Sequence, residues 1–170
     1  PSVSGGARDT GRFGPSSAAE GLALIERINA RGATAMVQPF IAGVESSGET
    51  AVIMIAGAVS HVLRKGSLLA ADEVAPMRTD DALGVAEIMY DPALVVAGSA
   101  EADELELARR ILAAVHERFA ATPLIARVDM LRSEAGEPVL LELEAIEPNL
   151  YFEHAPGAAE RLADAIARRA

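Results

Sequence analysis

Acidic side chains gather in one stretch near the end of the sequence, ARVDMLRSEAGEPVLLELEAIEP. Glu142 and Glu144 stand two residues apart, so in a β-strand both side chains point to the same face of a sheet. Asp129 lies in the preceding apolar run, and the short turn between the two runs would bring it beside the glutamates. Three carboxylates on one face repel one another unless a cation lies between them. Oxygen ligands of this kind suit Mg²⁺, which keeps some waters and shares phosphate oxygens with a substrate.

A solvated outer face is the alternative for these acids, because glutamate and leucine alternate on the outside of many acidic hairpins. Spacing alone supports the two interpretations about equally. Two observations favour the metal: the residue expected across the hairpin is Asp129 rather than a lysine, and Glu147 follows just beyond. Arg127 shares this face by the period of two. It can reach an anion held by the metal, or form an ion pair with Glu142 or Glu144.

The opening segment, PSVSGGARDTGRFG, is rich in glycine and serine and has no hydrophobic periodicity, which indicates a loop. The backbone N–H groups of Gly5 and Gly6, with the hydroxyl of Ser4, could wrap a phosphate chain. A tail without such a role is the alternative. Because the segment has the pattern of a loop cut from a longer chain, we expect the chain to be a fragment with a further part upstream.

The rest of the pattern predicts the elements that position these residues. A helix that starts at a capping box of Ser17 and Glu20 is expected first, and three segments have a helical pattern: about 17–31, 101–121 and 156–170. Strands are expected as a short segment at 34–43, which turns outward at Pro39, and as antiparallel hairpins at 49–66 and 124–146. A long irregular loop is expected between the hairpins. The order predicts an α+β fold, a mainly antiparallel sheet with helices packed on one side.

Composition excludes several other classes of protein. The 170 residues suffice for one domain with a core, and no apolar run approaches the length of a membrane span. A net charge of −10 argues against a nucleic-acid groove or an anionic membrane surface as partner. The absence of cysteine excludes disulfides, thiolate nucleophiles and cysteine zinc sites. It is compatible with the cytosol, and we expect a cytoplasmic protein.

Taken in order, these motifs resemble the C-terminal half of the ATP-grasp superfamily of carboxylate–amine ligases. SVSGGARDTGRF is similar to the loop over the triphosphate, VQPFIAGVE to the adenine hinge, and ARVDML…GEPVLLELEAIEP to the metal-binding hairpin. The resemblance covers essentially the whole chain and implies the ATP-grasp C-terminal catalytic portion, with an N-terminal domain upstream. It divides the chain into a glycine-rich phosphate loop, a helix with hinge and hairpin, a long loop, and a helix with the metal-binding hairpin and terminal helix: 1–16, 17–65, 66–100 and 101–170.

The resemblance also implies metal ligands. In the family an Asp, a Glu and, two residues later, usually an Asn hold one or two Mg²⁺ on the ATP phosphates, and the matching positions are Asp129, Glu142 and Glu144. Glutamate in place of the usual Asn makes the site more negative and is similar to the glutathione-synthetase-like and D-cycloserine-forming subgroup. Arg127 matches an arginine that contacts the transferring phosphoryl group, a catalytic role. Lys65 lies where some members place a phosphate-facing basic residue.

For the nucleotide, the hinge resemblance implies Gln38, Phe40 and Ile41, with the last two acting through backbone or packing. The ribose-binding acid falls on Glu45 by the spacing of the hinge, or on Glu49 by alignment to the following strand, and both stay open. A family lysine that contacts the phosphates would fall at or before the first residue and is absent from this chain.

The implied activity joins a small carboxylate substrate to an amine, forming a C–N bond and releasing ADP, with ATP and Mg²⁺ (or Mn²⁺) as cofactors. The carboxylate would pass through an acyl phosphate, and the chain by itself, as a fragment, is expected to be inactive. One alternative is an ATP-grasp-derived nucleotide-binding module without ligase activity. The complete set of acids argues against it, because a module without catalysis has no physical need to keep these acids together. Another is a structural α+β domain with an acidic face. Neither nucleic acid nor membrane is implied as a partner, and a homo-oligomer is left open.

Overall fold

The computed structural model describes residues 1–2, 9–66 and 93–169. The chain divides into two compact units. The first comprises Pro1–Phe40 with Ser67–Leu94, and the second comprises Ile41–Gly66 with Val95–Ala170.

The first unit contains the helix predicted near its start, α1 (Ala18–Ala30), whose buried residues Leu24 and Ile28 lie one turn apart. A short 3₁₀ turn, Pro15–Ser17, comes directly before it. The predicted capping box is wrong, because α1 has no side-chain cap hydrogen bond. Ser17 has φ −112° and ψ 20° rather than the extended backbone of a usual N-cap, and its hydroxyl accepts the N–H of Gly14 at 3.0 Å instead.

The predicted strand at 34–43 is also wrong. Residues 33–41 are irregular and pair with no strand in the described part of the chain, and a short helix, α2 (Gly43–Ser47), follows. The side chains of Met36 and Val37 are 64% and 78% exposed rather than packed on a sheet. Pro39 has no N–H to give to a neighbouring strand. β-Propensity without a partner strand is therefore not enough to form a strand here.

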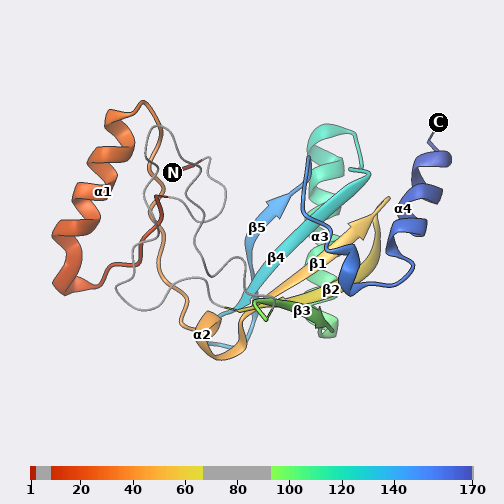
Figure 1. Cartoon of the computed structure of the whole chain (residues 1–170), viewed down its shortest axis with the longest axis horizontal. Helices are drawn as coiled ribbons and strands as arrows, with labels where there is room; N and C mark the ends of the chain where they lie inside the picture. Colours follow the sequence, from red (N-terminus) through yellow and green to blue (C-terminus); the bar gives the residue numbers. More distant parts are fainter. Residues whose placement is uncertain (3–8, 67–92, 170) are drawn as a thin grey trace. The chain divides into compact units, whose positions relative to one another are not determined.

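The second unit is built on a five-stranded antiparallel sheet of order β3-β2-β1-β4-β5 (Figure 1). Its strands are β1 (Glu49–Ile55), β2 (Ala58–Lys65), β3 (Val95–Gly98), β4 (Ile125–Arg132) and β5 (Pro138–Glu144). The β1–β2 and β4–β5 pairings confirm both predicted hairpins. The turn of the first falls at Ala56 and Gly57, both with positive φ. The central strand β1 is buried along its whole length.

Strand β3 lies within the segment predicted as a loop, so that prediction is wrong at its end. The strand pairs with β2 from Val62↔Gly98 to Lys65↔Val95. Its two valines were a β-signal, but a four-residue strand at a sheet edge is hard to separate from loop by pattern alone. The greater part of the predicted loop, 67–92, lies outside the described residues.

Helices cover both faces of the sheet, whereas the sequence pattern predicted one. Helix α3 (Ala102–Phe119) packs on one face, and α4 (Ala158–Ala167), which follows a 3₁₀ turn at Phe152–His154, packs on the other. The core on the α3 side consists of Val52, Met54, Ala108, Leu112, Ala126, Val128 and Met130. The core on the α4 side consists of Ala51, Ile53, Leu63 and Leu150, with Leu162 of α4 against it. The predicted α+β class is confirmed. No helix in the described part of the chain is long and apolar enough to cross a membrane.

Candidate metal centre

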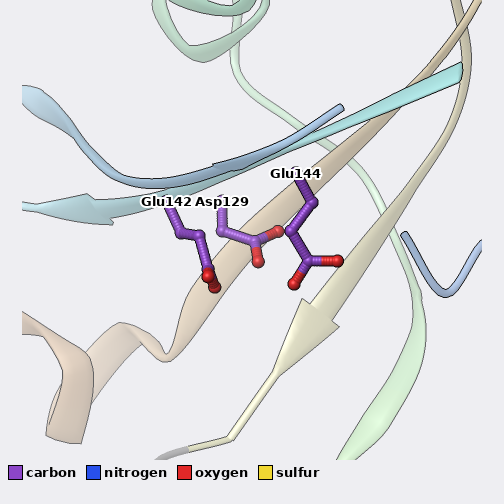
Figure 2. A group of neighbouring side chains, drawn as sticks. All are labelled: Asp129, Glu142 and Glu144. Carbon is purple, nitrogen blue, oxygen red and sulfur yellow. The ribbon is translucent and has the colours of Figure 1, made fainter. Parts of the chain in front are cut away.

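The β4–β5 hairpin brings together the three acids that the sequence singled out. Asp129 pairs with Glu142, and Arg127 pairs with Glu144. One carboxylate oxygen from each of Asp129, Glu142 and Glu144 lies within 4.8 Å of the others. Figure 2 shows the three side chains on one side of the sheet, with Asp129 between the two glutamates. A single cation placed among these oxygens could contact all three residues.

A β-bulge sets the direction in which β5 presents its acids. The register shifts between Asp129, opposite Glu142, and Met130, opposite Leu140, so Leu141 is the extra residue. Bulges commonly re-aim side chains next to functional sites. After the bulge, Leu143 packs against the α3-side core while its neighbours on the strand point to the other face.

Two cations lie among the acids, and each bridges two carboxylates. Lys65 Nζ lies 2.7 Å from Glu49 Oε2 and 2.8 Å from Asp129 Oδ2. Arg127 Nε donates to both Asp129 oxygens at 3.0 Å, and Arg127 Nη2 forms an ion pair with Glu144. The predicted alternative for Arg127, an ion pair with one of the glutamates, is thus the arrangement in this structure.

The strand register explains why these side chains share a face. Lys65 stands opposite Glu49 across β2 and β1, and Ala51, two residues along β1, stands opposite Asp129 on β4. Glu49 therefore belongs to the acidic cluster, whereas Glu45, the other candidate for the ribose, lies in the first turn of α2. Glu147 is exposed and is not part of the three-acid group.

The cluster carries an excess of negative charge, because four carboxylates meet two cations and two negative charges remain. The Glu142 side chain is exposed, but partial desolvation raises its pKa above the ordinary value, and the nearby carboxylates of Glu144 and Asp129 raise it further. Among the described residues no ion pair involves Glu142. Glu142 is therefore the carboxylate of the cluster whose charge is least compensated. A divalent cation would balance the excess negative charge.

The two cations are held in their charged forms. Burial acts to lower the pKa of Lys65, but the carboxylates of Asp129 and Glu49 outweigh it and the pKa is raised. Burial likewise acts to lower the pKa of Arg127, but the hydrogen bonds and charge of Asp129, together with the charge of Glu144, outweigh it, so this pKa is also raised. Both side chains can therefore serve as fixed positive charges toward a phosphate.

One part of this surface was not foreseen from the sequence, namely the segment just after β5. The backbone oxygen of Asn149 accepts from Arg127 Nη1 at 3.4 Å, and the ring centroid of Tyr151 lies 6.0 Å from the Arg127 guanidinium carbon. His61 Nε2 donates to the backbone oxygen of Leu150 at 2.8 Å. The contacts to Asn149 and Leu150 pass through backbone oxygens, so residue types and spacing give no signal for them.

The nucleotide-binding predictions other than Lys65 and Glu49 fall elsewhere in the chain. Three of them lie outside the described residues: Ser4, Gly5 and Gly6. Gln38 and Phe40 belong to the first unit, where the guanidinium carbon of Arg12 lies 3.5 Å from the centroid of the Phe40 ring. Ile41 is the first residue of the second unit. The roles of these residues stay predictions.

Known proteins match this chain along almost its whole length. The cycloserine biosynthesis protein DcsG of Streptomyces lavendulae is 29% identical over 163 residues, which are 95% of this chain and 51% of that protein. The crystal structure of D-cycloserine synthetase DcsG superposes with a TM-score of 0.83 at 27% identity, covering 99% of this chain and 54% of that one. The chain therefore spans about half the length of the relatives it matches.

A weaker likeness joins the chain to D-alanine–D-alanine ligase from Bacillus anthracis complexed with ATP, with a TM-score of 0.47 at 13% identity over 88% of the chain and 45% of that structure. That likeness is too low to carry an argument about the site. No family model matches the sequence. The fold is that of the matching part of D-cycloserine synthetase, as the resemblance implied.

Proposed function

We propose that the chain, which is similar to D-cycloserine synthetase, is an ATP-grasp protein and an ATP- and Mg²⁺-dependent carboxylate–amine ligase. The observation that carries the proposal is the convergence of Asp129, Glu142 and Glu144 on one face of the β4–β5 hairpin. Because the chain spans about half of the relatives it matches, the activity and the substrates are both part of the proposal.

The cluster fits a divalent cation on three counts. Its ligands are carboxylate oxygens, the donors that Mg²⁺ and Mn²⁺ prefer. One divalent cation would balance its excess of two negative charges. Partial desolvation and the like charges of Glu144 and Asp129 already raise the pKa of Glu142. Asp129, Glu142 and Glu144 would hold the ion, which when bound neutralises charge on the terminal phosphates of ATP.

Arg127 and Lys65 would complete the phosphate site as fixed cations. Arg127 is only 6% exposed, and its guanidinium is oriented by Asp129, by Glu144 and by the backbone oxygen of Asn149. A guanidinium held in this way is preorganised to stabilise charge on a transferring phosphoryl group. Lys65, fixed by Glu49 and Asp129, would contribute a second positive charge at the same end of the sheet.

The proposed chemistry needs no covalent protein nucleophile. A carboxylate oxygen of the acid substrate attacks the γ-phosphorus of ATP, and the bond to the leaving ADP breaks. The amine substrate then attacks the carbonyl carbon of the acyl phosphate, the C–N bond forms as the C–O bond to inorganic phosphate breaks, and the amine nitrogen releases one proton to solvent. The absence of cysteine from the sequence is compatible with this route.

A thermal-shift experiment tests the proposal on the chain as it exists. The melting temperature is measured with ATP, with Mg²⁺, and with both, for the parent and for a Glu142→Ala, Glu144→Ala variant. We expect the rise with ATP and Mg²⁺ together to exceed the rise with either alone and to be absent from the variant, because a ligand at one hundred times its Kd stabilises the folded state by about 2.7 kcal/mol. A rise of equal size in the variant would contradict the assignment of these acids.

Activity is measured next on a form of the protein extended to the full length of the relatives it matches, as ADP released from Mg²⁺-ATP in the presence of candidate acids and amines. Glu142→Gln should abolish ADP release, because it removes one negatively charged ligand without changing the side-chain size. Full turnover in that variant would refute the assignment of Glu142 as a metal ligand, even if ATP binding were confirmed. Nucleotide binding without ADP release in the presence of any acid would favour the binding-module alternative.

A further inference from the structure

A second ionic cluster lies on the opposite face of the same strands. Glu104, in the first turn of α3, is 1% exposed, and its Oε1 accepts the hydroxyl hydrogen of Thr50 at 2.7 Å. Arg64 Nη2 lies 3.6 Å from Glu104 Oε2, and Arg132 Nε lies 3.5 Å from Glu104 Oε1. Glu104 Oε2 also accepts the backbone N–H of Glu101 at 2.8 Å. We call Glu104 with Thr50, Arg64 and Arg132 the Glu104 clamp.

Two members of the clamp are sequence neighbours of residues in the acidic cluster. Thr50 follows Glu49 on β1, and Arg64 precedes Lys65 on β2. Neighbouring residues of a strand point to opposite faces, so each of these pairs spans the sheet. A shift of either strand that displaces the clamp residue must also displace its neighbour in the cluster. The clamp itself is tight here, because Arg64 Nη1 also donates to the Thr50 hydroxyl.

The third strand of the clamp is β4, which carries Asp129 and ends at Arg132. Arg132 is itself held in place: its Nη2 donates to Asp103 Oδ1 at 2.8 Å, and its Nη1 donates to the backbone oxygen of Gly136 at 2.8 Å. The buried carboxylate of Glu104 therefore contacts side chains from β1, β2 and β4. These strands also supply the Glu49–Lys65–Asp129 bridge on the other face.

A charged clamp is not needed to attach α3 to the sheet. Further along the helix, Ala108 and Leu112 attach it through apolar contacts. Burying a carboxylate with its partners gains little stability over an apolar residue of similar size, and its best-attested use is to fix one arrangement among several. Directional contacts from one carboxylate to three strands further restrict how those strands can shift relative to one another.

We propose that Glu104 is a positioning residue for the acidic cluster: from the opposite face of the sheet it holds β1, β2 and β4 at the spacing at which Lys65 bridges Glu49 and Asp129. Glu104 contacts none of the proposed metal ligands. The importance of Glu104 for the ligase reaction rests on the proposed function. The strand spacing that Glu104 sets does not depend on that function and can be measured without catalysis.

The experiment uses the fact that Lys65 is the only lysine among the 170 residues. Lysine labelled with ¹³C at Cε therefore gives one NMR signal, which reports on the centre of the bridge. Glu104→Gln keeps the size of the side chain and can still accept from Thr50, but it removes the charge that the two arginines face. Leu112→Ala is the matched control, since Leu112 is buried on the same helix outside the clamp.

We expect Glu104→Gln to shift the Lys65 signal and to weaken Mn²⁺ binding about tenfold, the lower end of what is seen when a residue that orients metal ligands is replaced. Leu112→Ala should lower the melting temperature but leave both the signal and the Mn²⁺ affinity as in the parent, when measured well below its melting temperature. An unchanged Lys65 signal in Glu104→Gln would overturn the proposal, because the clamp would then serve only to attach α3.

A second pair of variants decides the matter if Glu104→Gln does not fold. Thr50→Val keeps the shape of the side chain without the hydroxyl and should shift the Lys65 signal, whereas Thr50→Ser restores the hydroxyl and should return the signal to its parent position. Equal signals in these two variants would overturn the proposal. If the parent fails to bind Mn²⁺, the proposed metal site is refuted, and the Lys65 signal still decides the role of the clamp.

Discussion

Replacing Arg127 by methionine should destabilise the protein strongly, and Mg²⁺ should reverse part of the loss. Arg127 is 6% exposed and bridges Asp129 and Glu144. Methionine occupies much of the same space, but without the guanidinium the cluster changes from two excess negative charges to three. Removing one partner of a buried ion pair typically costs about 3–5 kcal/mol, since the remaining charge is left uncompensated.

The expected change in melting temperature follows from that range. For a chain of this size each kcal/mol lowers the melting temperature by about 2–4 °C, so Arg127→Met should melt about 6–20 °C below the parent in EDTA. The Glu144 side chain is 32% exposed and partly screened by water, which favours the lower half of the range. Mg²⁺ should then raise the melting temperature of the variant more than that of the parent, because it supplies the missing positive charge.

The assay is thermal unfolding followed by circular dichroism, in EDTA and in millimolar Mg²⁺. Arg31→Met is the matched control, since Arg31 pairs with Asp9 at 3.4 Å and its side chain is 44% exposed. Such surface pairs contribute about 1 kcal/mol or less. If Arg127→Met melted no lower than Arg31→Met in EDTA, or gained no more from Mg²⁺ than the parent, the electrostatic account of the cluster would be refuted.

Two other changes test the site and the backbone beneath it. Because the pKa of Glu142 is raised, the folded state binds more protons than the unfolded state between about the ordinary pKa of 4.5 and the folded-state pKa, and stability falls as pH rises through that window. In EDTA, Glu142→Gln should therefore melt above the parent at neutral pH and at the same temperature as the parent below the window. A difference in melting temperature that does not depend on pH would contradict this. Gly48→Ala should cost about 2–5 kcal/mol in urea unfolding, since a Cβ at φ +63° would lie 2.4 Å from the backbone oxygen of Lys65. Gly32→Ala, at φ +77° with nothing within 4 Å, should cost only the backbone strain of about 1–2 kcal/mol, and equal costs would argue against the close approach at Gly48.

The acidic hairpin could be predicted because everything that forms it is local. The period of two places Glu142 and Glu144 on one face, and the turn is short enough to fix Asp129 opposite them. The ion pairs of Lys65 with Glu49 and Asp129 depend instead on the register of three strands. A phosphate-binding role for Lys65 was therefore predicted only from the family resemblance and not from local spacing.

Other features depended on partners far away in the sequence. The segment around Pro39 has strand-forming residues, but no strand pairs with it in the described structure. The run Ala51–Ile55 is apolar at every position, which indicates burial on both faces, and α4 indeed covers the face opposite α3. Glu104 stands where acids commonly favour the start of a helix, and only the distant Arg64 and Arg132 reveal why it is buried.

The central claim is that the β4–β5 acids form a divalent-cation site, and binding of Mn²⁺ followed by electron paramagnetic resonance tests it most directly. The parent is compared with Glu142→Gln, Glu144→Gln and with a control, Glu134→Gln, Glu137→Gln, which removes two exposed acids from the turn of the same hairpin. The account predicts that the parent and the control bind Mn²⁺ alike, that Mg²⁺ displaces it, and that the first variant loses the site. Equal Mn²⁺ affinity in all three proteins would contradict this claim and favour the alternative interpretation, in which these acids only form a solvated face of the hairpin.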